Sequence, residues 1–68
     1  MDKQQQLELL QKEVMEKAAR HLQAVRALPD EGEPDISLLN EAIRTKNEWN
    51  EVVGRMNRLL EEMLREKE

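Results

Sequence analysis

A run of apolar residues at helical spacing, between Asp35 and Lys67, constrains this chain more than any other feature. The positions recur at alternating steps of three and four, and all but Lys46 are apolar: Leu39, Ala42, Lys46, Trp49, Val53, Met56, Leu60 and Met63. This alternation is typical of coiled coils and helical bundles. Further apolar residues flank and widen this face, namely Leu38, Ile43, Val52, Leu59 and Leu64. Because so wide an apolar face is unstable in water, the helix is predicted to pack against something.

The first part of the chain predicts a second helix, over about residues 3–28. Asp2 can cap its start, and Gln5 can complete a capping box. Its apolar residues again have helical spacing, namely Leu7, Leu10, Val14, Ala18, Leu22, Val25 and Leu28, with Met15 at the edge. Pro29 disfavours helical geometry in the residue before it. Residues 29–34 hold two prolines and Gly32, which predicts a turn, and Asp35 can cap the helix over about residues 35–67.

These elements predict an all-α fold, in which residues 1–68 form a single antiparallel helical hairpin. Folding the chain about Gly32 makes the numbers of facing residues add to about 64, which brings Trp49 near Met15 and Ala18. The same register sets the last apolar residues against the polar start of the chain, at Met1 to Gln6. That end is expected to lack cover within the chain. The sequence therefore predicts self-association, most simply into a four-helix bundle.

Composition argues against several classes of protein. The chain has no cysteine, which excludes disulfides and thiolate ligands. Its net charge is −4, with acidic and basic residues mixed along both halves, so binding to nucleic acid is not expected. No apolar run is long enough for a membrane span, and the N-terminus lacks the apolar core of a signal peptide. We therefore expect a cytoplasmic protein without membrane contact.

Residues able to carry catalysis are few. His21, Ser37 and Thr45 are each the only residue of their type. A Ser-His-acid arrangement needs a water-excluded cleft, which two helices do not provide. A di-metal bundle uses Glu-x-x-His, but the residue three positions before His21 is Ala18. We expect no enzymatic activity, no metal, no cofactor and no small-molecule ligand.

The predicted function is therefore a non-enzymatic protein–protein interaction or oligomerisation module that acts through the apolar face of the second helix. Its partner would be another copy of the chain or, as in a small helical chaperone, a helix of another protein. Tryptophan is enriched at the energetic centres of interfaces, which favours Trp49 as an anchor. The residues expected to bind the partner are Leu39, Trp49, Val53, Met56, Leu59, Leu60, Met63 and Leu64.

Two stretches resemble known families. The turn Leu28-Pro-Asp-Glu-Gly-Glu-Pro-Asp-Ile36 is similar to the turn region of the Rop family of plasmid copy-number proteins, which implies an RNA-binding dimer. The layout from Pro29 to Trp49, with Leu38 and Leu39 about ten residues before the aromatic residue, resembles type III secretion needle subunits and their small hairpin chaperones. Such regular patterning is also compatible with a designed bundle.

Overall fold

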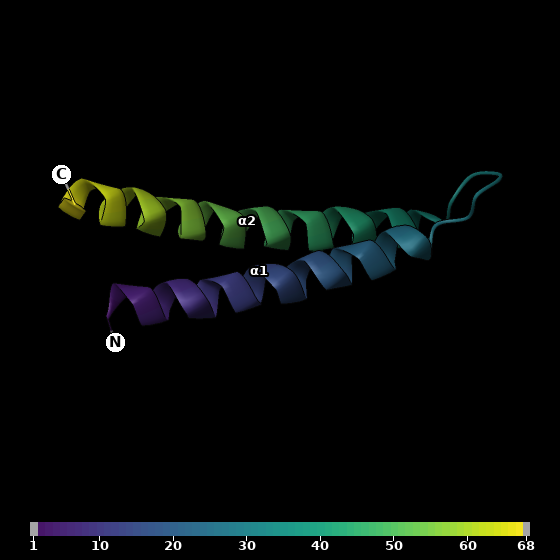
Figure 1. The fold of residues 1–68 in the computed structure, drawn as a ribbon. Helices are drawn as coiled ribbons and strands as arrows, with labels where there is room; N and C mark the ends of the chain where they lie inside the picture. Colours follow the sequence, from purple (N-terminus) through teal and green to yellow (C-terminus); the bar gives the residue numbers. More distant parts are fainter. Residues whose placement is uncertain (1, 68) are drawn as a thin grey trace.

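Two helices connected by one loop make up the part of the chain that the computed structural model describes, residues 2–67 (Figure 1). Helix α1 spans Lys3–Arg26 and helix α2 spans Ile36–Lys67. The helices run antiparallel and pack against each other, so the predicted all-α hairpin is confirmed. Helix α1 ends two residues before the predicted position, and α2 begins one residue after it. Met1 and Glu68, the ends of the predicted domain, lie outside the described residues.

The start of α1 has the capping box that the sequence predicts. The backbone N–H of Gln5 donates to Oδ1 of Asp2 over 2.8 Å, and the N–H of Asp2 donates to the side-chain oxygen of Gln5 over 3.3 Å. These two bonds satisfy donors that a helix start otherwise leaves open. Local sequence is therefore sufficient to set where α1 begins.

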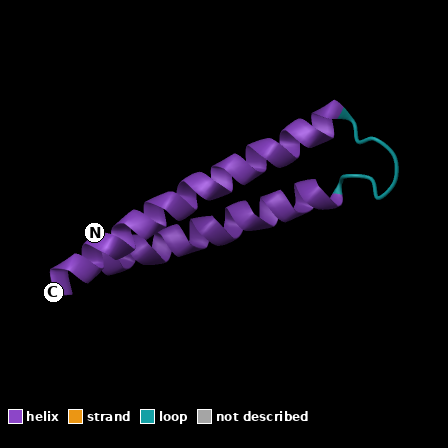
Figure 2. Cartoon of the chain, turned by 90° about the horizontal axis from the view of Figure 1, so that it is seen from above, coloured by secondary structure: helices purple, strands orange, loops and turns teal. Residues whose placement is uncertain are grey.

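The loop between the helices follows from its own residues (Figure 2). Gly32 has a φ of 84°, a left-handed conformation that is costly for residues with a Cβ. Asp35 then caps α2, because its Oδ1 accepts from the N–H of Ser37 over 3.2 Å and its carbonyl accepts from Leu38 and Leu39. The loop thus reverses the chain and starts α2 in the direction of the hairpin.

Polar contacts between the helices set the register. Lys17 Nζ lies 3.4 Å from a carboxylate oxygen of Glu48, and His21 Nδ1 lies 3.0 Å from Thr45 Oγ1. The numbers of these pairs add to 65 and 66, close to the predicted 64. At the open end, Lys3 pairs with Glu66 and lies 3.8 Å from a carboxylate oxygen of Glu62. The hydrogen bond that Lys3 donates to Glu66 and the nearby carboxylate charges raise the pKa of Lys3.

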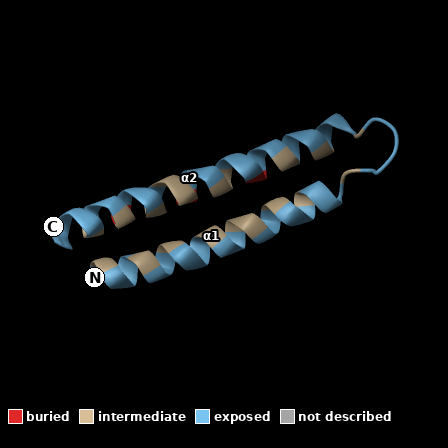
Figure 3. Ribbon diagram, turned by 45° about the horizontal axis from the view of Figure 1, so that its top comes forward, coloured by how far each residue is buried: buried red, intermediate tan, exposed pale blue. Residues whose placement is uncertain are grey.

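The face that α2 turns toward α1 differs from the predicted face in one of its two rows (Figure 3). The row Ala42, Trp49, Met56 and Met63 lies toward α1 as predicted, and each of its members is half-buried. The other row is Leu38, Thr45, Val52 and Leu59, and it replaces the predicted row Leu39, Lys46, Val53 and Leu60. Both rows adjoin the shared row, so periodicity alone does not choose between them. The structure buries the hydroxyl of Thr45, which is hydrogen-bonded, and leaves the charge of Lys46 in water.

One further expectation about packing is wrong. Leu59 has an exposed fraction of only 7%, so this chain already covers a residue that was expected to lack cover. This follows from the change of row, which rotates the inward face of α2 by about half of one residue position, or roughly 50°, relative to the prediction. Trp49 lies next to His21, with ring centroids 5.8 Å apart, and Met15 is exposed.

The hairpin is long and thin. It measures 53 × 16 × 15 Å, and its radius of gyration is 15.8 Å, against about 11 Å for a compact chain of this length. Its accessible surface is 5542 Å², roughly 1,100 Å² above the value expected for a compact monomer of 8.0 kDa. Among the described residues, only Val52, Leu59 and Thr45 are buried. One layer of contacts between two helices therefore leaves much apolar surface in water.

Candidate interaction surface

A row of eight residues runs along α2 beside the row of Trp49 and Met56, on the flank that does not face α1. We call it the α2 stripe, and it consists of Leu39, Ile43, Lys46, Asn50, Val53, Asn57, Leu60 and Leu64. Ile43 and Leu64 are exposed by 56% and 63%. Leu39 is also exposed, and Val53 and Leu60 are half-buried. Burial of side chains of this size is favourable, so the stripe is a candidate surface for contact with another molecule.

Helix α1 carries a shorter apolar stripe, which lies only in its second half. The α1 stripe consists of Met15, Ala18, Leu22 and Val25. Met15 is exposed by 72% and Leu22 by 48%. The residues that continue this line toward the N-terminus are Gln4, Glu8 and Gln11, all exposed and polar. On this flank of α1, the apolar surface is therefore confined to the half next to the loop.

The other broad face of the hairpin is polar. Two shallow grooves between the helices open on that face, and their walls are mostly charged, with Glu13, Arg20, Glu41, Arg44, Glu48 and Arg55 among the lining residues. Arg44 lies 3.0 Å from Glu48 and Arg55 lies 2.6 Å from Glu51, so these charges are paired along α2. Both stripes lie on the flank of their helix that is opposite these grooves. They consequently share one face of the hairpin, which we call the outer apolar face.

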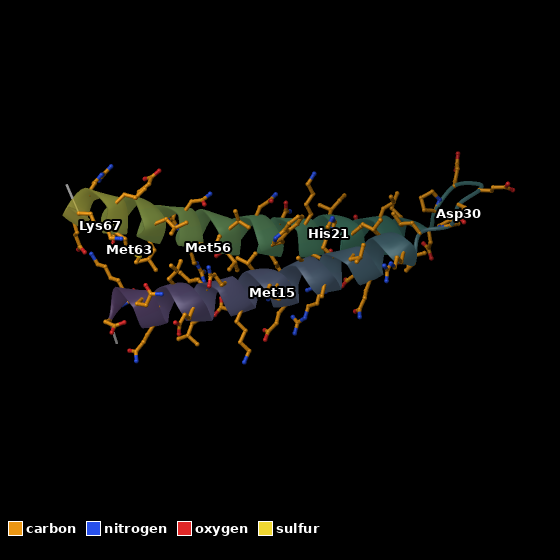
Figure 4. The ribbon with its side chains drawn as sticks, in the orientation of Figure 1. Met15, His21, Asp30, Met56, Met63 and Lys67 are labelled. Carbon is orange, nitrogen blue, oxygen red and sulfur yellow. The ribbon has the colours of Figure 1, made fainter. Side chains whose placement is uncertain are left out.

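The eight residues predicted to bind a partner divide into two groups. Leu39, Val53, Leu60 and Leu64 belong to the α2 stripe. Trp49, Met56, Leu59 and Met63 lie in the rows that face α1, and Figure 4 shows Met56 and Met63 along that edge of α2. Ile43 was predicted only at the margin of the apolar face of α2, and Met15, Leu22 and Val25 were not among the residues predicted to bind a partner. These residues are identified by their exposure in the structure, which depends on the rotation of each helix and cannot be read from the periodicity of the sequence.

Between the helices lies a small polar cluster formed by His21, Thr45 and Trp49. The hydroxyl of Thr45 donates to the backbone carbonyls of Glu41 and Ala42, each over 3.0 Å. When the single hydrogen of this hydroxyl points to those carbonyls, the Nδ1–H tautomer of His21 donates to Thr45 Oγ1. The indole N–H of Trp49 is buried, and the described residues provide no hydrogen-bond partner for it. The cluster links α1 to α2 at one position along the axis of the hairpin and so contributes to the register.

Residues 2–67 contain neither a candidate metal site nor a candidate membrane-spanning helix. No group of three or more His, Cys, Asp or Glu side chains in this range is arranged to hold a metal ion. Neither helix, over the same range, has a stretch both long and apolar enough to cross a membrane. Asp30 in the loop lies at the end of the hairpin, away from His21 of the polar cluster (Figure 4).

Comparison of this chain with protein families, with curated proteins and with solved structures finds no match. A proposal for the function therefore rests on the outer apolar face of the hairpin.

Proposed function

We propose that this chain is a non-enzymatic interaction module that associates with itself, and that two hairpins pack through their outer apolar faces into a four-helix bundle. The observation that carries the proposal is the division of the hairpin into an apolar and a charged broad face. Ile43 and Leu64 are among the exposed side chains of the first, whereas the described polar grooves open on the second. A face of this kind gains stability when an equivalent apolar face covers it.

The exposed area is of the size that such a dimer needs. A specific and stable interface buries about 600–1,000 Å² on each partner. The hairpin has an accessible surface of 5542 Å², and its excess of roughly 1,100 Å² over a compact monomer can supply that area. Association through the outer apolar face would thus bring each chain near the exposure expected of an ordinary folded protein.

The test is the solution mass, measured by light scattering over a hundredfold range of concentration, with helical content followed by circular dichroism. The wild-type chain is expected to be a dimer with full helicity. Replacing Ile43 with Lys places a charge in the proposed interface, and the dimer should then dissociate at least tenfold more readily. The hairpin itself should keep its helicity, because Ile43 is 56% exposed and does not pack between α1 and α2.

A matched control is available on the polar face. Leu9 is exposed by 49%, and Leu9→Lys adds the same charge outside the proposed interface. This variant should keep the wild-type mass. A wild-type chain that is monomeric at all concentrations, or equal effects of Ile43→Lys and Leu9→Lys, would overturn the proposal. A helical monomer would instead favour the other function for such a surface, the covering of a helix from a different protein.

A further inference from the structure

The α2 stripe is symmetric about its own midpoint. Its eight residues are separated by steps of four, three, four, three, four, three and four, so the spacing is the same in both directions. The midpoint lies between Glu51 and Val52. The chemistry is also nearly symmetric, because the two outer positions at each end are Leu or Ile, whereas three of the four central positions are Lys46, Asn50 and Asn57. Such a stripe can complement itself in a two-fold symmetric contact.

An antiparallel second copy of α2, centred on that midpoint, would match like with like in three of its four kinds of pair. Residues whose numbers add to 103 then face each other. Leu39 meets Leu64 of the partner subunit, and Ile43 meets Leu60 of the partner subunit. Near the centre, Lys46 meets Asn57 of the partner subunit, and Asn50 meets Val53 of the partner subunit. All four outer apolar residues are thus paired with apolar residues, and the hydrogen-bonding groups of Lys46 and Asn57 can satisfy one another.

Other ways of stacking two outer apolar faces fit less well. In a parallel α2 pair each residue faces its own copy, so Lys46 would face Lys46 of the partner subunit, which is unfavourable for like charges. In a dimer with both loops at one end, α2 would lie on the partner's α1. The hairpin register would then set Leu60 and Leu64 against the polar start of α1, near Gln4 and Gln5. The first arrangement thus brings like charges together, and the second leaves the apolar far end of α2 without apolar cover.

The positions of the outer apolar residues also disfavour sliding. A shift of the antiparallel pair by one heptad would move Leu39 onto Asn57 of the partner subunit and would leave Leu64 uncovered. Only the centred register covers all four outer Leu and Ile residues with apolar residues, so this register should dominate.

We propose that two copies of this chain pair through α2, antiparallel and centred between Glu51 and Val52, with the two loops at opposite ends of the bundle. Leu39, Ile43, Leu60 and Leu64 select this register. The inference rests on the proposed self-association and adds which helices meet, in which direction and at which residues.

Distances between spin labels, measured by pulsed electron paramagnetic resonance, test this arrangement. The chain contains no cysteine, so Asn40→Cys and Glu61→Cys each provide a single labelling position. Both residues are exposed and lie outside the α2 stripe. At about 1.5 Å of rise per residue, the antiparallel arrangement separates the two copies of position 40 by about 35 Å and the two copies of position 61 by about 30 Å.

The outcomes separate the two proposals. Distances near 35 Å and 30 Å in a dimer would support the antiparallel α2 pair. Distances below about 20 Å at both positions, in a labelled protein that is still dimeric by light scattering, would overturn this pairing and leave the proposed self-association standing. If the labelled and the unlabelled chains are both monomeric at every concentration, both the α2 pairing and the proposed self-association are wrong. Circular dichroism of each labelled variant confirms that the helices are intact.

Discussion

At the scale of single residues, the contact between His21 and Thr45 is the most specific interaction between the two helices. Thr45 is 4% exposed, and its Oγ1 lies 3.0 Å from Nδ1 of His21. Replacing Thr45 with Val keeps the shape but removes the acceptor. We expect the free energy of unfolding to fall by about 1 kcal/mol, because a part-buried donor loses its partner. Urea unfolding followed by the fluorescence of Trp49 measures this change.

The control for this prediction is a double substitution. In His21→Leu/Thr45→Val both polar partners are absent, so no donor is left without an acceptor, and much of the lost stability should return. If the two single substitutions simply add in the double variant, the hydrogen bond makes no coupled contribution and the explanation is wrong.

At the scale of elements, the two glycines are predicted to respond in opposite directions to the same substitution. Gly54 lies within α2, and a Cβ built there meets nothing within 4 Å. Gly54→Ala should therefore stabilise the chain by about 1 kcal/mol, since alanine favours helix more than glycine does. Gly32 has a φ of 84°, so Gly32→Ala should destabilise the turn by about 1 kcal/mol. Thermal unfolding by circular dichroism provides both values.

The Gly54→Ala substitution also tests whether a partner helix packs against α2 at this position. Gly54 is beside the α2 stripe and not within it. The Gly54→Ala variant should accordingly have the mass of the wild-type chain by light scattering. A loss of association would mean that a partner helix lies against Gly54, and the position of the proposed contact would have to move toward it.

At the scale of the whole molecule, thermal stability should depend on concentration. When folding and association are coupled, a tenfold higher concentration stabilises the dimer by about 1.4 kcal/mol. For two chains of 68 residues this corresponds to a rise in Tm of about 5 °C per tenfold. Calorimetry at several concentrations measures the slope. The Ile43→Lys variant should show a much smaller slope, and equal slopes for both proteins would contradict a role for the outer apolar face.

The sequence by itself determined the elements of this protein, because the signals that set them are local. The Asp2–Gln5 capping box, the break at Pro29 and Gly32 and the capping by Asp35 each act within a few residues, and each is present in the structure. The turn also brings the two helices together within one or two residues of the predicted register. Helix position and hairpin direction therefore required no knowledge of packing.

Only the tertiary structure decided how far each helix is rotated about its axis. The apolar face of α2 is wider than one neighbouring helix can cover, so Leu39 and Leu60 are as compatible with helical spacing as Leu38 and Leu59. In the observed rotation, His21 of α1 meets Thr45 and Lys17 meets Glu48. This rotation buries the hydrogen-bonded hydroxyl of Thr45 and keeps the charge of Lys46 in water, whereas the predicted rotation would bury that charge. The same rotation leaves Ile43 and Leu64 exposed on the outer apolar face.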